Sequence, residues 1–140
     1  MNSTTLRRTL ALGAITGMRS MAGPAALAFR PGGLLSRATM MLAAGEMVAD
    51  KTPYVGARTA PLPFAGRVLS GALVGGVIAR EERANMVMGA LIGAAAAAIA
   101  AHLAYHARKR LPLSNVVGGS LEDLVVVGIG ALAADAGSRT

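Results

Sequence analysis

The sequence contains no cysteine and no tryptophan, and it has only two phenylalanines and two tyrosines. Without cysteine, the chain forms no disulfide bond and offers no thiolate to a metal ion. Cysteine usage therefore does not indicate whether the protein lies in an oxidising or a reducing compartment. The shortage of aromatic rings also argues against nucleic-acid binding, because single-strand sites combine a basic groove with aromatic stacking platforms.

Charged residues make up only 15% of the chain, whereas soluble domains carry about 25%. Hydrophobic residues make up 54%, and 30 of the 140 residues are alanine and 18 are glycine. Such small residues allow helices to pack closely in lipid, where no hydrophobic effect drives helices together. We therefore predict one all-α domain over residues 1–140, an integral membrane bundle of four or five short Gly/Ala-rich helices.

Basic residues outnumber acidic ones by 14 to 7, which gives a net charge of +7. They stand in short groups between apolar runs, as the loop charges that flank membrane spans do. On a five-span topology the difference between the two sides is small, so an N-terminus inside the cell is only a preference. We expect the protein to lie in a lipid bilayer and not to bind nucleic acid.

Hydropathy alone identifies one span, Ala84 to Ala107, which carries no charge and would reach about 36 Å as a helix. The other apolar stretches are shorter or contain charges. They either span the bilayer with charges buried in the bundle, or some of them are re-entrant. Pro24, Pro31 and the stretch 53–63 interrupt the pattern. The expected helices cover approximately 8–29, 34–50, 62–79, 84–107 and 116–135.

Residues 1–28 have a second interpretation. Arg7 and Arg8, the apolar run Thr9–Met18 and the stretch 26–28, Ala-Leu-Ala, follow the order of a secretory signal. Arg19 directly after the apolar run argues against a signal, and the rest of the chain stays membrane-like with or without this segment. Cleavage of the segment is therefore left open.

The pattern Gly-Ala-aliphatic-x-Gly occurs three times in the sequence. Glycines four residues apart lie on one helix face and let another backbone come close. We predict a helix-packing role for these glycines, and an internal repeat is an open alternative. The six residues are Gly13, Gly17, Gly71, Gly75, Gly89 and Gly93.

Charged residues within the apolar stretches are the candidate functional residues. An ionisable group in the bilayer costs roughly 2.5 to 3.5 kcal/mol on insertion scales, so it faces a partner, a cavity or a substrate path. Two acidic pairs, Glu46 with Asp50 and Glu122 with Asp123, are predicted to lie on an ion or substrate pathway. Arg19, Lys51 and Arg67 are predicted to balance their charge or to bind an anion.

His102 and His106 are spaced as metal-binding histidines on one helix face, which makes them weak candidates for a metal site. The glutamate of the metalloprotease motif is missing between them, and no further ligand is apparent. Because Tyr105 and the basic run 108–110 lie beside them, anchoring at the membrane interface is the preferred interpretation. The sequence has no nucleophile elbow, phosphate loop or cofactor fingerprint, so we expect neither an enzyme nor a cofactor.

Several short motifs together resemble a bacterial family of small multi-pass membrane proteins that is catalogued only as a domain of unknown function. The likeness extends over roughly residues 10–134 and implies a bacterial inner-membrane location, without an activity. A fainter resemblance joins residues 46–52 to the Glu-x-Gly-Asp-Lys-Thr signature of calcium and manganese cation/proton exchangers, with one extra residue and no glycine here. The family motifs are Gly17-Met18-Arg19-Ser20, Gly23-Pro24, Glu46-x-x-x-Asp50-Lys51-x-Pro53, Gly66-Arg67 and Glu122-Asp123.

Two functions follow from these patterns. The first is a transporter or channel for a cation, a proton-coupled solute or an anionic small molecule, assembled as a homo-oligomer because a few short helices enclose little volume. The second is a structural or partner-binding membrane protein whose charges are packing ion pairs.

Overall fold

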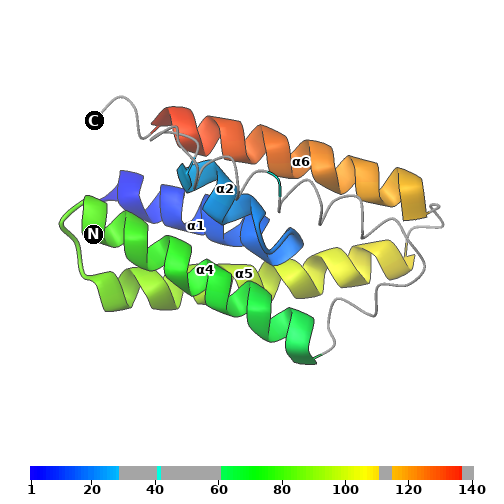
Figure 1. Cartoon of the computed structure of the whole chain (residues 1–140), viewed down its shortest axis with the longest axis horizontal. Coiled ribbons are helices and arrows are strands. Elements are labelled where there is room, and N and C mark those ends of the chain that lie inside the picture. The colour runs from blue at the N-terminus through cyan, green and yellow to red at the C-terminus, as the bar shows by residue number, and fades with distance from the viewer. Residues whose placement is uncertain (29–40, 42–60, 111–114, 137–140) are drawn as a thin grey trace.

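The computed structural model describes residues 1–28, 41, 61–110 and 115–136. All the elements among these residues are helices, and no strand occurs in them, which confirms the all-α class for this part of the chain. The range expected at 34–50 falls outside the described residues, apart from Met41. The helices are α1 (Ser3–Met18), α2 (Ala22–Ala28), α4 (Pro61–Glu81), α5 (Met86–Arg110) and α6 (Asn115–Ala136) (Figure 1).

The single helix expected over 8–29 is divided into α1 and α2. Arg19 leaves the helix with extended backbone angles, φ −141° and ψ 114°. In a continuous helix, the ring of Pro24 would clash with the carbonyl of Ser20, and the bond to that carbonyl would be lost. In α2, Pro24 lies in the first turn, where a backbone N–H has no intrahelical partner in any case. The chain therefore turns at residues 19–21, and α2 runs back beside α1 (Figure 1).

Helix α1 occupies the centre of the described structure, because it packs against α2, α4, α5 and α6. Helices α4 and α5 form an antiparallel hairpin on one side, and α6 lies along α1 and α2 on the other (Figure 1). Leu12 and Ile15 of α1 form the apolar core with Val74 and Ile78 of α4 and Val126 of α6. The second half of α1 is thereby held inside the bundle.

The turn between α4 and α5 is fixed by backbone hydrogen bonds. Ala84 N donates to Ala79 O at 2.7 Å and Arg83 N donates to Arg80 O at 3.1 Å. These are the two bonds of a Schellman motif, and Arg83 takes the left-handed position, with φ 53°. Asn85 then caps α5 by accepting a hydrogen bond from Met88 N at 3.0 Å.

Glycines join α1, α4 and α5 backbone to backbone. A Cβ added at Gly13 would lie 2.9 Å from Gly93 O, and one added at Gly71 would lie 2.6 Å from the same oxygen. An added Cβ at Gly75 would come within 3.1 Å of Gly93 Cα. Such separations are too short for a real side chain, so Gly93 is the junction at which the three backbones meet.

Large apolar side chains lie on the outer surface as well as in the core, and three arginines are buried. Large apolar side chains that are each more than half exposed follow the outer faces of α4, α5 and α6, whereas Arg8, Arg19 and Arg67 are buried. The exposed set includes Leu69, Leu73, Val87, Leu91, Ile99, Leu103, Leu124, Val127 and Leu132.

Among the described helices, only α5 is long and apolar enough to cross a membrane by length and composition. The mean hydropathy of its most apolar 18-residue window is 1.9, and 22% of that window is buried in the structure. The core helix of a soluble protein passes the same test but is mostly buried. One such helix gives weak support for a membrane location.

Candidate functional site

Arg19 lies at the turn that separates α1 from α2, and its side chain is fully buried. Its backbone N–H closes the last turn of α1 by donating to Ile15 O at 2.8 Å. Its guanidinium donates to one oxygen of Asp123, with 2.6 Å from Nη2 to Oδ1 and 3.0 Å from Nε to Oδ1. This ion pair fastens the helix break to α6, across 104 residues of sequence.

Glu122 precedes Asp123 in α6 but faces a different arginine, because neighbouring helix residues point about 100° apart. Arg108 Nε lies 2.9 Å from Glu122 Oε1, and Arg108 Nη2 donates to Oε2 at 3.4 Å. The two carboxylates of this acidic pair therefore do not converge on one point. Each is bonded to a guanidinium from another part of the bundle.

Arg108 is a site residue that the sequence interpretation missed, since the run 108–110 was assigned to the membrane interface. A usable signal was present. Only residues 111–114 separate α5 from α6, and so short a connection favours antiparallel neighbours. The last turn of α5 and the early turns of α6 then lie close together, which brings Arg108 within reach of Glu122.

Arg67 is a second buried arginine of the predicted site, with 4% of its surface exposed. It lies one turn before Gly71 in α4. Gly71 and Gly17 both meet Ala97 of α5. Arg19 and Arg67 therefore lie within about one turn of the same α5 residue, and both belong to one level of the bundle. The inner layer is defined here as Arg19, Arg67, Arg108, Glu122 and Asp123.

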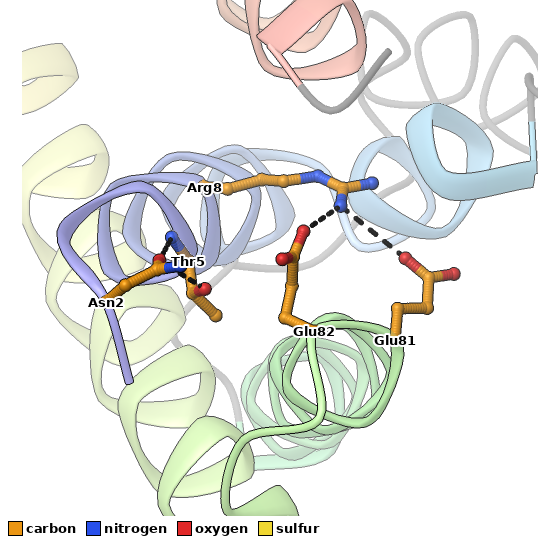
Figure 2. A network of polar contacts seen from close by, with 5 residues as sticks. All are labelled: Asn2, Thr5, Arg8, Glu81 and Glu82. Atoms are coloured by element: carbon orange, nitrogen blue, oxygen red, sulfur yellow. Dashed lines mark hydrogen bonds and ion pairs between the residues drawn. The ribbon is translucent and has the colours of Figure 1, made fainter. Parts of the chain in front are cut away.

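A second group of charges lies at the opposite end of α1, around Arg8 (Figure 2). Arg8 is 5% exposed, and its Nη1 lies 3.5 Å from Glu81 Oε2 and 3.5 Å from Glu82 Oε1. Glu81 is the last residue of α4, and Glu82 follows it in the turn. Beside it, Asn2 caps α1 by accepting a hydrogen bond from Thr5 N at 2.7 Å. The outer layer is defined as Arg8, Glu81 and Glu82.

The outer layer was also missed in the sequence. Arg8 looked like a flanking or signal-peptide charge, and neither glutamate was singled out. Two carboxylates at the carboxyl end of a helix, however, interact unfavourably with the helix dipole. Such a pair predicts a cationic partner from another element.

The remaining candidates are placed as follows. His102 and His106 are exposed on the last turns of α5. The His102 ring is edge-on to Phe64 of α4 at 5.1 Å, and its Nδ1 lies 3.0 Å from Ala98 O. No group of three or more His, Asp or Glu suited to a metal ion occurs among the described residues. Glu46, Asp50 and Lys51 lie outside the described residues.

The six glycines of the repeated motif all lie at helix contacts. Gly17 faces the backbone of Ala97, and Gly89 faces the backbone of Gly75, so neither position has room for a Cβ. The three copies pack against one another, since α1, α4 and α5 each contribute one.

The fold and the buried charges define a small all-α bundle with an apolar exterior and two charged layers in its interior. No family model, curated protein or solved structure matches the chain. Both family resemblances therefore stay predictions.

Arg8 and Arg19 are eleven residues apart in the sequence, which separates the two layers by about 16 Å along α1. The space between them is taken up by Leu12, Ile15 and the glycine junction at Gly93. Charged groups thus lie near both ends of the bundle, with a closely packed apolar section between them.

Proposed function

We propose that this protein is an integral membrane protein of the bacterial inner membrane. The stretch from Met86 to Tyr105 is 20 residues long, about 30 Å as a helix, which is the thickness of the hydrocarbon core. The charged α4–α5 turn lies before it. After it come Tyr105, His106 and the basic residues 108–110, a composition typical of the membrane interface.

The exposed apolar faces support the same proposal. Leu69 and Leu73 on α4 and Leu91 on α5 are each more than half exposed, and they would face lipid. In water, these apolar faces would stay exposed unless a partner covered them. In a bilayer, acyl chains cover them along the whole helix. Helices α4 and α6, at 21 and 22 residues, are long enough to cross with α5.

Helix α1 has 16 residues and α2 has 7, fewer than the roughly 20 that a membrane span needs. We propose that they form a re-entrant hairpin, which enters the bundle from one end and turns back at Arg19. Non-helical backbone at membrane depth is tolerated where it is buried in protein, and Arg19 at the turn is buried against α6.

Within this setting, we propose that the protein transports a small anion or a proton-coupled solute, and that the inner layer is its site. The observation that carries the proposal is Arg19, which is 0% exposed at a helix break and bonded to Asp123 from another helix. Broken helices form the substrate sites of many transporters, and the planar guanidinium suits anionic groups. A homo-oligomer is part of the proposal.

Selective cation binding has less support in the described residues. Asp123 and Glu122 are each engaged by an arginine, which offsets the negative charge that would attract a cation. A cation pathway would depend on Glu46 and Asp50. The anion and the proton-coupled solute are therefore the favoured substrates.

The same ion pairs favour a second candidate, a structural or partner-binding membrane protein. The bonds from Arg19 to Asp123 and from Arg108 to Glu122 connect α6 to two other parts of the bundle. Such pairs fix one helix arrangement without any substrate. Removing one partner of a buried pair typically destabilises a protein by about 3–5 kcal/mol.

Flux into proteoliposomes separates the two candidates. We expect the wild type to move at least one probe among chloride, phosphate, formate and protons, and Asp123→Asn to lose at least about tenfold of that flux because Arg19 is no longer balanced. Lys109→Gln is the matched control, since this exposed cation lies outside both layers.

The thermal midpoint of each variant in detergent is measured in parallel. Lost flux with a native-like midpoint supports transport. A wild type that moves none of the probes, together with a large fall in the midpoint for Asp123→Asn, overturns transport and favours the structural role.

A further inference from the structure

We propose that the route through the protein lies between α6 and the α1–α2 hairpin, and that α6 moves against a rigid unit of α1, α4 and α5. This inference rests on the proposed transport function, because it names the moving part at the same site. It follows from a difference between two kinds of helix contact in the structure.

The contacts within α1, α4 and α5 leave no room for motion. Their backbones touch at Gly13, Gly71 and Gly93, and a Cβ added at Gly13 or Gly71 would lie 2.6–2.9 Å from the carbonyl oxygen of Gly93. Sliding one helix along another would drive a neighbouring residue with a side chain into this junction. A solute cannot pass through a contact in which main-chain atoms already meet.

The contacts of α6 with α1 and α2 are of the ordinary kind. A Cβ added at Gly130 would lie 3.5 Å from Ile15 Cδ1 and 3.9 Å from Ala26 Cβ, which are normal van der Waals separations. The interface consists of side chains such as Ile15, Val126 and Ile129. Side chains can change rotamer and let a helix shift by a few ångströms, which backbone contacts do not allow.

Polar bonds hold the first half of α6 in place. Asp123 accepts from Arg19 and Glu122 lies against Arg108, and the two residues are adjacent in the chain. An anion that bonds to Arg19 would compete directly with Asp123 for the same donors. Release of Asp123 would break one of the two polar bonds that hold α6. Binding of the solute and movement of α6 are therefore coupled at the guanidinium of Arg19.

Distances between spin labels test the movement independently of transport. The chain has no cysteine, so labels attach only where cysteine is introduced. One pair, Leu103→Cys with Leu124→Cys, reports on α6 relative to α5. The control pair, Leu73→Cys with Ile99→Cys, lies within the proposed rigid unit. All four side chains are exposed, so labels there leave the packing intact.

For the α6 pair in liposomes, we expect two populations of label distance, or a shift of about 5 Å when Asp123→Asn is introduced. The control pair should keep one narrow distribution. A single unchanged distribution for the α6 pair overturns the proposal, and so does a control pair that shifts as much as the α6 pair. Either result holds whether or not a probe is transported.

Cross-linking ties the movement to the proposed function. Ala26→Cys with Gly130→Cys joins α2 to α6, because a Cβ at Gly130 lies 3.9 Å from Ala26 Cβ, which is within disulfide range. This bond should abolish flux of chloride, phosphate, formate or protons until reductant restores it. Gly76→Cys with Ala90→Cys, whose Cβ atoms would lie 3.7 Å apart, joins α4 to α5 and should leave flux unchanged. Equal flux with and without the α2–α6 bond overturns the route between α6 and the α1–α2 hairpin.

Discussion

At the residue scale, burial separates residues of the same type into different roles. Arg7 is exposed and Arg8 is buried, although the two are adjacent. Gly66 has open space around it, whereas Gly93 meets two other backbones. Each of these pairs offers a variant and its control in the same chemical class, so a change at one member can be compared directly with the same change at the other.

Gly93→Ala should destabilise the bundle by about 1–3 kcal/mol, because the new Cβ would meet Gly71 O and Gly75 Cα and the backbones must shift. Gly66→Ala should be neutral or stabilising by up to about 1 kcal/mol, since alanine favours the helix and nothing lies within 4 Å. Because the chain has no tryptophan, thermal unfolding in detergent is followed by far-UV circular dichroism. An equal loss of stability for Gly93→Ala and Gly66→Ala would contradict the close backbone packing at Gly93.

Arg8→Gln should lower stability by about 1.5–3 kcal/mol, because it removes the charged donor that lies between Glu81 and Glu82. Arg7→Gln removes the same charge from an exposed side chain and should change stability by less than about 0.5 kcal/mol. The measurement is again thermal unfolding. If both variants behave alike, the outer layer contributes nothing beyond net charge.

At the element scale, apolar runs and charge spacing indicate where the long helices lie. The ranges expected at 62–79, 84–107 and 116–135 lie within a few residues of α4, α5 and α6. The division of 8–29 was not expected, although Pro24 was recognised as a breaker. Length and hydropathy describe a segment along its own axis, so they cannot show that the chain reverses.

The partners of the buried charges could not be predicted from local patterns. Arg19 and Asp123 are 104 residues apart, and only the assembled helices bring them together. The sequence could identify both as charges that need a partner, because an unpaired charge in an apolar segment is costly. It could not identify which arginine each carboxylate bonds.

At the scale of the whole molecule, exposed apolar faces and buried arginines support the proposed membrane location. The two charged layers lie near the ends of the bundle, and α1 carries no charged residue between them. A homo-oligomer would cover part of the exposed faces, and lipid would cover the rest.

A membrane-impermeant maleimide tests this arrangement in intact cells. Single cysteines at Arg83 and Lys109, at the two ends of α5, should be labelled from opposite sides of the membrane. Ile99→Cys, in the middle of α5 and exposed in the isolated chain, should stay unlabelled because lipid covers it. Labelling of Ile99→Cys as rapid as that at the two ends would contradict insertion.

The separation of the two charged layers has a consequence for the electric field. If the proposed transport lets water reach Arg8 from one side and Arg19 from the other, the membrane potential falls across only about 16 Å of protein, roughly half of the bilayer. A single charge that passes from one layer to the other then moves through nearly the whole potential, about 2.3 kcal/mol at 100 mV. Transport by this protein would respond steeply to voltage.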